Sequence, residues 1–222
     1  MKSLCIGVGT SSVAGPCPGA DLDARNIYNI VKDLSTESTL LLNETATRTA
    51  VLDKMSNIVD GTDLTFMFFA GHGGSQRMKL HAPEEIDGND EMIFTYDGKI
   101  IDDEIWNIIS KSNHRVFLMF DCCHSETMFR VAPPRSMFAL PQHDQIDMLC
   151  WSGCADNKVS YGDSSGGEFT KAFLHYYSPA FKYSDIWTLL ENDSVLKHSE
   201  IIKSTELKTS SSSAFDGKLI FT

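Results

Sequence analysis

Two short segments of the chain carry side chains that could do nucleophilic chemistry. His72 lies among glycines directly after an apolar run over residues 64–70, and Asp121-Cys122-Cys123-His124 follows a second apolar run over residues 115–120. A cysteine thiol needs a nearby base or positive charge to become a thiolate at neutral pH, because its ordinary pKa is about 8.5. An imidazole can take the thiol proton and later return a proton to a leaving amine. The two segments therefore predict a cysteine nucleophile with a histidine base.

The pattern around these segments predicts an α/β fold. Apolar runs that end abruptly in small or polar residues indicate buried parallel strands, and a 3.6-residue period indicates helices. We expect strands at residues 4–8, 64–70, 115–120 and 146–151, and helices at residues 24–34, 47–59, 102–110, 167–177 and 184–190. Such alternation predicts a mainly parallel central sheet with helices on both faces. Ligands bind beyond the carboxyl ends of strands in these sheets, which is where His72 and Cys123 stand.

The composition favours one globular domain and excludes several other classes. The 222 residues are 42% hydrophobic, enough for a sizeable core, and six cysteines are too few for a disulfide scaffold. Lys and Arg number 19 against 30 Asp and Glu, so the net charge is −11. This charge argues against nucleic-acid binding and suits a positively charged substrate. No apolar run is long enough to span a membrane, and we expect a cytoplasmic protein.

Three other stretches of the sequence predict loops or a packed chain end. Residues 84–104 hold nine acidic residues and one basic residue, Lys99, and we expect a polar loop there. Residues 133–142 are also expected to form a loop. The apolar residues 219–221 near the end predict a final strand or a docked tail.

Several blocks of the sequence resemble the metacaspases, and they occur in the same order. Phe69-Ala70-Gly71-His72-Gly73-Gly74 resembles their Tyr-Ser-Gly-His-Gly block, and Asp121-Cys122-Cys123-His124-Ser125 resembles their Asp-x-Cys-His-Ser-Gly block. Further similar blocks lie at residues 19–26, 87–91, 100–104, 151–156 and 211–216. The step from His72 to Cys123 is 123 − 72 = 51 residues, close to the spacing of about 50 in caspases.

The resemblance implies a fold and an activity. The implied fold is the caspase-type, haemoglobinase-like α/β fold, as a single domain over residues 1–222. A large-subunit-like part would cover about residues 1–130, and a small-subunit-like part about residues 145–222. The implied activity is that of a cysteine endopeptidase with a Cys–His dyad that cleaves after Arg or Lys.

The resemblance also assigns roles within the catalytic site. The dyad would be His72 and Cys123, with the backbone N–H groups of Gly73 and Cys123 holding the oxyanion. Side chains alternate at the end of a strand, so only one of Cys122 and Cys123 can face His72. His124 would then point elsewhere.

A basic substrate side chain needs an acidic pocket, because a desolvated guanidinium requires carboxylate partners. Asp23 and Asp121 stand where the family has its two pocket aspartates, and Asp156 stands where a third polar group could help. Judged without the family, Asp121 could equally be a turn residue and Asp23 a helix cap. The expected partners are proteins or peptides with a basic residue before the cleaved bond. The resemblance favours a monomer.

Three positions depart from the family pattern. Ala70 replaces a serine, Glu126 replaces a glycine, and Arg130 stands where many relatives have an aspartate used for calcium. The chemistry itself needs no cofactor, and calcium is expected at most as an activator. Calcium takes six to eight oxygen ligands. Asp87, Asp102 and Asp103 could supply several of these oxygens.

Other readings of the same residues stay open. A zinc site could draw on Cys122, Cys123, His124, Cys150 and Cys154, although their spacing is not that of zinc fingers. A protein of the caspase fold could also bind partners without cleaving them. A nucleotide-binding module is disfavoured, because the glycines around His72 lack the lysine of a phosphate-binding loop. Finally, Arg130 and Arg135 are candidate positions for autoprocessing.

Overall fold

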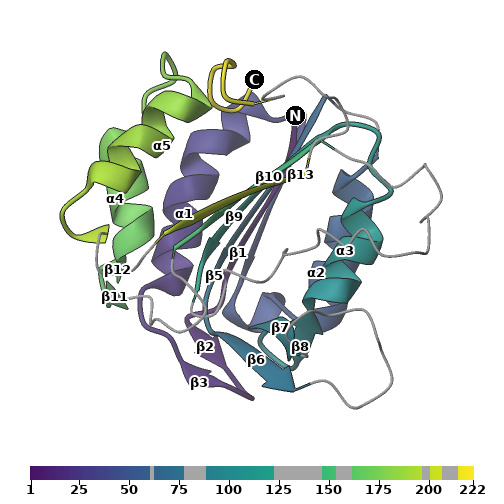
Figure 1. The fold of residues 1–222 in the computed structure, drawn as a ribbon. Coiled ribbons are helices and arrows are strands. Elements are labelled where there is room, and N and C mark those ends of the chain that lie inside the picture. Colours follow the sequence, from purple (N-terminus) through teal and green to yellow (C-terminus); the bar gives the residue numbers. More distant parts are fainter. Residues whose placement is uncertain (61–62, 78–88, 123–146, 154–161, 197–200, 207–214) are drawn as a thin grey trace.

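The computed structural model describes residues 1–60, 63–77, 89–122, 147–153, 162–196, 201–206 and 215–222. Its centre is a six-stranded sheet with the order β13-β10-β9-β5-β1-β4 (Figure 1). The parallel strands are β1 (Lys2–Gly7), β4 (Glu37–Leu42), β5 (Leu64–Ala70), β9 (Arg115–Asp121) and β10 (Met148–Ser152). β13 (Ile202–Glu206) pairs antiparallel with β10. The mainly parallel sheet predicted from the sequence is confirmed.

Helices cover both faces of this sheet, as Figure 1 shows. One face is covered by α1 (Ala20–Val31), α4 (Glu168–Tyr176) and α5 (Tyr183–Asn192). The other face is covered by α2 (Arg48–Ile58) and α3 (Asp102–Ile109). Short 3₁₀ turns follow α1 at Lys32–Leu34 and β4 at Asn43–Thr45. All five helices that the periodicity predicts are present, with ends that differ by at most a few residues.

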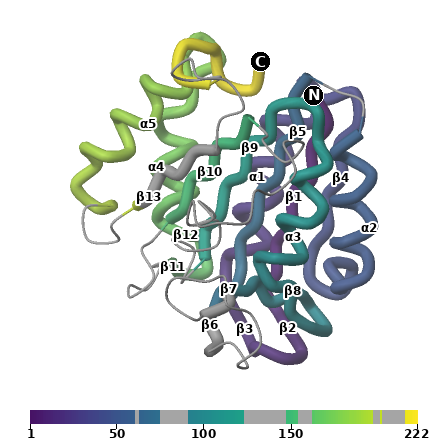
Figure 2. Tube along the Cα trace, turned by 45° about the vertical axis from the view of Figure 1, so that its right-hand side comes forward, coloured from purple at the N-terminus to yellow at the C-terminus, as the bar shows by residue number. Residues whose placement is uncertain are grey.

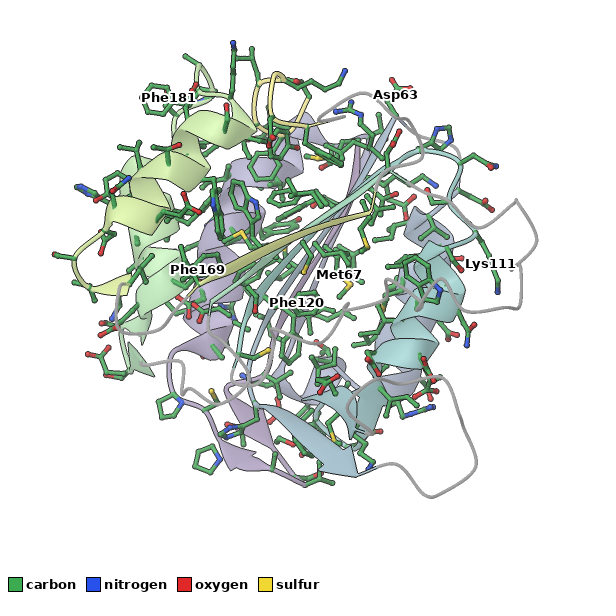
Figure 3. The ribbon with its side chains drawn as sticks, in the orientation of Figure 1. Asp63, Met67, Lys111, Phe120, Phe169 and Phe181 are labelled. Atoms are coloured by element: carbon green, nitrogen blue, oxygen red, sulfur yellow. The ribbon has the colours of Figure 1, made fainter. Side chains whose placement is uncertain are left out.

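The central strands are apolar throughout because they are buried on both faces. Phe66 and Phe68 of β5 pack in the core under α1, α4 and α5, whereas Met67 packs in the core under α2 and α3. Phe120 of β9 also packs in the core under α2 and α3. Figure 3 labels Met67 and Phe120 inside the molecule, with Phe169 of α4 on the opposite side of the sheet.

The chain order reverses at β1. From β1 the chain passes through α1 to β4 on one side, and then through α2 to β5 on the other side. The carboxyl ends of β1 and β5 therefore flank a topological switch point, where α/β sheets bind their ligands.

Small sheets surround that end of the central sheet. They are the hairpin β2 (Thr10–Ser11) and β3 (Gly15–Pro16), the hairpin β11 (Gly162–Asp163) and β12 (Gly166–Gly167), and the sheet of β6 (Gly73–Arg77), β7 (Asn89–Phe94) and β8 (Lys99–Ile101). Figures 1 and 2 both show β2, β3, β7 and β8 at the end of the molecule opposite the N and C marks.

The prediction of a polar loop over residues 84–104 is wrong where the structure describes it. β7 and β8 pair antiparallel, with Met92 opposite Ile101 and Ile93 opposite Ile100. Ile93 and Ile100 are buried in the core under α2 and α3, and Met92 is buried as well, although this stretch is rich in acidic residues. The many acidic residues of this stretch led to the prediction of a loop and obscured these apolar positions.

Two edge strands were not predicted, but the docked tail was. β4 and β13 lie at the edges of the sheet, and their sequences, Glu-Ser-Thr-Leu-Leu-Leu and Ile-Lys-Ser-Thr-Glu, are not apolar throughout. Near the end of the chain, Phe215, Ile220 and Phe221 are buried in the core under α1, α4 and α5.

Among the described residues, no helix combines the length and apolar character needed to cross a bilayer.

Candidate active site

His72 follows the end of β5 and is held by a backbone carbonyl. The side chain is half-buried, and its Nε2 lies 2.9 Å from the carbonyl oxygen of Pro16. A carbonyl oxygen can only accept a hydrogen bond, so Nε2 carries the proton and donates it to Pro16. In the neutral ring this leaves the lone pair on Nδ1. Nδ1 is therefore the atom of His72 that can act as a base.

The carbonyl of Pro16 is fixed because the hairpin that carries it is anchored to its surroundings. The hydroxyl of Ser11 is buried and donates a hydrogen bond of 2.8 Å to the carbonyl oxygen of Thr95, just after β7. β7 pairs with β6, and the amide of Phe94 donates a bond of 2.9 Å to the carbonyl oxygen of His72. The hairpin and the histidine are thus both attached to β7.

The register of the sheet brings the two chemical segments to one edge. β5 and β9 are adjacent and parallel, and Ala70 is paired with Asp121. His72 follows Ala70 by two residues, and Cys123 follows Asp121 by two residues. Cys123 itself lies outside the described residues, as do Asp87, Asp156, His124, Glu126, Arg130, Arg135 and Cys154.

The neighbouring cysteine is poorly placed to react with a substrate. Cys122 is 1% exposed and lies in the core under α2 and α3. A cysteine buried among apolar side chains is inert, because a thiolate there would lose its hydration. Burial therefore argues against Cys122 as the nucleophile.

The structure brings Asp23 and Asp121 together at the start of α4. Asp23 is 2% exposed, and its Oδ2 accepts a hydrogen bond of 2.7 Å from the amide of Gly167. Asp121 is 6% exposed, and its Oδ2 accepts bonds from the amide of Thr170, at 3.0 Å, and from the hydroxyl of Thr170, at 2.6 Å. Asp23 lies inside α1 and binds a distant residue, so the reading of Asp23 as a cap of its own helix is wrong.

Two glycines allow the carboxylates to come this close to the chain. A Cβ atom on Gly166 would lie 2.2 Å from Oδ1 of Asp23, and one on Gly167 would lie 2.2 Å from Oδ2 of Asp121. Gly166 also has φ of +115°, which side chains rarely allow. Gly166, Gly167 and Thr170 were not predicted, and their one signal in the sequence is a Ser-Ser-Gly-Gly turn pattern at residues 164–167.

Asp23 has unusual electrostatics for an aspartate. The pKa of Asp23 is raised to about 7, chiefly by burial and also by the charge of Asp121, against the hydrogen bond from Gly167, which lowers it. Among the described residues, Oδ1 of Asp23 is buried and has no hydrogen-bond partner. A buried acceptor of this kind marks a place that a donor group of a ligand can fill.

Of the three residues predicted to bind calcium, Asp102 and Asp103 lie in the part of the chain that the structure describes. Asp102 and Asp103 are the first two residues of α3, and the amide of Asp103 donates a bond of 3.0 Å to Oδ1 of Asp102. Glu104 forms an ion pair with Arg48. Within the described part of the chain, no three His, Cys, Asp or Glu side chains form a metal-binding group. Two neighbouring carboxylates do not complete the six to eight oxygens that calcium takes.

The fold and this edge of the sheet define a caspase-type α/β protein, and two solved structures share that fold. One is the protein GSU0716 from Geobacter sulfurreducens, with a TM-score of 0.78 and 21% identity over 100% of this chain and 98% of that chain. The other is caspase-1 from Spodoptera frugiperda, with a TM-score of 0.64 and 13% identity over 93% of this chain and 86% of that chain. The predicted caspase-type fold is confirmed.

Residues 2–199 match the family described as the caspase domain, so the chain belongs to the caspase-domain family. The chain is 31% identical over 146 residues to metacaspase-1 of Cryptococcus neoformans var. neoformans serotype D, covering 57% of this chain and 32% of the relative. It is 24% identical over 241 residues to metacaspase-5 of Trypanosoma brucei brucei, covering 89% of this chain and 48% of the relative. The chain thus spans about a third to a half of the length of these relatives, and the resemblance to metacaspases is confirmed.

Proposed function

We propose that this protein is a cysteine endopeptidase of metacaspase type that cleaves peptide bonds after Arg or Lys, with His72 and Cys123 as its dyad. The observation that carries the proposal is the pairing of Ala70 with Asp121 on adjacent parallel strands. His72 and Cys123 each follow that pair by two residues, and the carboxyl ends of parallel strands meet at one edge of the sheet.

The proposed reaction starts from the tautomer that Pro16 imposes on His72. Nδ1 takes the proton of the Cys123 thiol, and the sulfur attacks the carbonyl carbon of the substrate. The backbone N–H groups of Gly73 and Cys123 donate hydrogen bonds to the oxyanion that forms. The C–N bond then breaks as His72 returns its proton to the leaving amine, which leaves a thioester on Cys123.

Water completes the cycle. His72 takes a proton from a water molecule as its oxygen attacks the thioester carbonyl. The C–S bond breaks and releases the new carboxylic acid. The sulfur of Cys123 regains the proton, so the enzyme returns to its starting state.

The preference for a basic residue follows from Asp23 and Asp121. Both carboxylates are buried beside the start of α4, and a guanidinium or ammonium group would neutralise their charge. The buried Oδ1 of Asp23 supports this assignment, because it lacks a donor among the described residues. Asp156 is proposed as a further polar group of the pocket. Ala70 lacks the hydroxyl that relatives have at that position, so we expect the two carboxylates to carry the specificity.

A panel of fluorogenic peptides with Arg, Lys or Asp before the cleaved bond tests this function. We expect cleavage of the Arg and Lys peptides and none of the Asp peptide. Cys123→Ala should abolish cleavage, whereas Cys122→Ala should keep much of it. Cleavage that survives Cys123→Ala but not Cys122→Ala would overturn the assignment of the nucleophile.

Calcium activation and autoprocessing are tested with the same protein. A calcium chelator should lower the rate if Asp87, Asp102 and Asp103 contribute to an activating site, and an unchanged rate refutes that part of the proposal. Comparison of the intact masses of the wild type and Cys123→Ala reveals cleavage after Arg130 or Arg135.

The departures at Ala70, Glu126 and Arg130 favour one second candidate function, which is a protein of the caspase fold that binds partners without cleaving them. The peptide panel separates the two. A well-folded wild type that cleaves none of the peptides, with or without calcium, supports the binding protein.

A further inference from the structure

Helix α4 begins without a cap of its own. Its N-cap residue is Gly167, which has no side chain to bind the first amides of the helix. Instead, Oδ2 of Asp121 accepts a hydrogen bond from the amide of Thr170, the third residue of α4. An N-cap side chain ordinarily makes this bond. Here a carboxylate from the end of β9 makes it across 49 residues of sequence.

Thr170 binds the same carboxylate oxygen twice. Its hydroxyl donates a bond of 2.6 Å to Oδ2 of Asp121, in addition to the amide bond of 3.0 Å. The side chain of Thr170 is fully buried, so water cannot replace a lost donor easily. Hydrogen bonds to a charged group in such surroundings are stronger than those between neutral groups.

The same turn of chain also holds Asp23. The amide of Gly167, three residues before Thr170, donates to Oδ2 of Asp23. One oxygen of each carboxylate is therefore bound by the segment from Gly167 to Thr170. The start of α4 thus contacts both carboxylates.

We propose that Thr170 is a positioning residue that determines specificity: its hydroxyl fixes the Asp121 carboxylate in the orientation that binds a basic substrate side chain. The proposal rests on the proposed function, since it assumes that Asp121 belongs to the substrate pocket. Thr170 acts through Asp121 and does not touch the substrate. Its loss should therefore change binding of the basic side chain and leave the bond-breaking steps unchanged.

The chain offers a matched control. Thr65 is also a buried threonine, and its hydroxyl donates a bond of 2.8 Å to the carbonyl oxygen of Ile58. It lies at the start of β5, paired with Val116, and so at the opposite end of the sheet from Asp121. Thr65→Val removes a buried hydroxyl in the same way as Thr170→Val, but far from the pocket.

The experiment measures both binding and cleavage. Calorimetry on proteins that also carry Cys123→Ala gives the Kd of a peptide ending in arginine and of the same peptide ending in norleucine. Fluorogenic assays on proteins with Cys123 intact give KM and kcat. We expect Thr170→Val to raise the Kd and KM of the arginine peptide about tenfold or more. The kcat and the Kd of the norleucine peptide should change less than about twofold.

Thr170→Ser and Thr65→Val serve as the control variants. Thr170→Ser keeps the hydroxyl and should bind the arginine peptide within about twofold of the wild type, as should Thr65→Val. Arginine binding by Thr170→Val that equals that of Thr65→Val overturns the proposal, as does an equal loss in Thr170→Ser. A wild type that binds the arginine peptide but cleaves nothing contradicts the peptidase alone. Absence of arginine binding contradicts the acidic pocket and the role of Thr170 together.

Discussion

Nε2 of His72 donates a hydrogen bond of 2.9 Å to the carbonyl oxygen of Pro16, which connects a hairpin near the N-terminus to the end of β5. This contact fixes the tautomer of the ring and leaves Nδ1 to act as a base. A backbone carbonyl here does what a carboxylate does in a Ser-His-Asp triad, namely orient the imidazole. We therefore expect the geometry of the β2–β3 hairpin to matter for the proposed reaction, although no side chain of the hairpin is proposed to react.

Ser11→Ala tests the part played by that hairpin. The Ser11 hydroxyl donates to the carbonyl of Thr95 and accepts from the amide of Ala14 at 3.1 Å. Its loss should loosen the hairpin, which the bonds of Ser12 to the carbonyl of Tyr96 still hold, and shift the carbonyl of Pro16. We expect kcat to fall about tenfold with KM nearly unchanged, and stability to fall by about 1 kcal/mol. Steady-state kinetics with the arginine peptide and a urea titration measure both.

A matched control for this variant is Ser56→Ala. Ser56 lies on the exposed side of α2, and its hydroxyl donates to the carbonyl of Leu52 at 2.9 Å. We expect kinetics equal to those of the wild type. A normal kcat in Ser11→Ala would mean that the hairpin does not control His72.

Binding of a basic side chain should depend on the ionisation of Asp23. Burial raises the pKa of Asp23 to about 7, so the carboxyl is mostly neutral at pH 6 and mostly charged at pH 8. The Kd of the arginine peptide for the Cys123→Ala protein should therefore fall about tenfold between these values. Asp23→Asn should bind the peptide weakly and show no such pH dependence. A tenfold change that persists in Asp23→Asn would assign the effect to another group.

The same group makes stability depend on pH. The folded-state pKa of Asp23 is about 7, above its ordinary value of 3.8, so the folded protein holds this proton more tightly than the unfolded chain. The stabilising contribution is present below pH 4 and is lost as pH rises through 7. We expect the free energy of unfolding of Asp23→Asn, relative to the wild type, to rise by roughly 2–4 kcal/mol across this window. Urea titrations at several pH values measure it, and a constant difference would contradict the burial of an ionising carboxyl.

Gly167→Ala should damage the pocket by crowding. The backbone of Gly167 has φ of −75°, which alanine adopts freely, but the new Cβ would lie 2.2 Å from Oδ2 of Asp121. Either the carboxylate or the start of α4 must move. We expect KM for the arginine peptide to rise about tenfold or more and stability to fall by about 1–3 kcal/mol.

Gly217→Ala provides the comparison for this variant. A Cβ on Gly217 would meet nothing within 4 Å, so neither KM nor stability should change measurably. If Gly167→Ala matches Gly217→Ala in KM, Asp121 is not a pocket residue.

Much of the fold could be predicted because burial on both faces leaves a plain pattern. β5 and β9 are continuous apolar runs, and the five helices show clear periodicity. β4 and β13 lie at the edges of the sheet and are not apolar throughout, which is why they were missed. The strands β7 and β8 were missed because their buried residues stand among acidic ones. The sequence alone does not indicate which of these side chains face the core.

The site was predictable only where a residue type implies a chemistry. His72 and Cys123 have the side chains of a candidate base and a candidate nucleophile, and Asp23 and Asp121 were proposed as pocket residues through the resemblance to metacaspases. Pro16 and Thr170 contribute a backbone carbonyl and a hydroxyl. Such groups occur many times in any sequence and do not by themselves indicate a role. Their roles depend on contacts across 56 and 49 residues, and only the fold reveals these contacts.

The most direct test of the Cys123–His72 dyad is covalent labelling with a peptide chloromethyl ketone that ends in arginine, followed by mass mapping. We expect one adduct on Cys123 in the wild type, a rate of labelling at least about a hundredfold lower in His72→Ala, and much slower reaction with the aspartate analogue. An adduct on Cys122, or labelling of Cys123 that is indifferent to His72, would contradict the account.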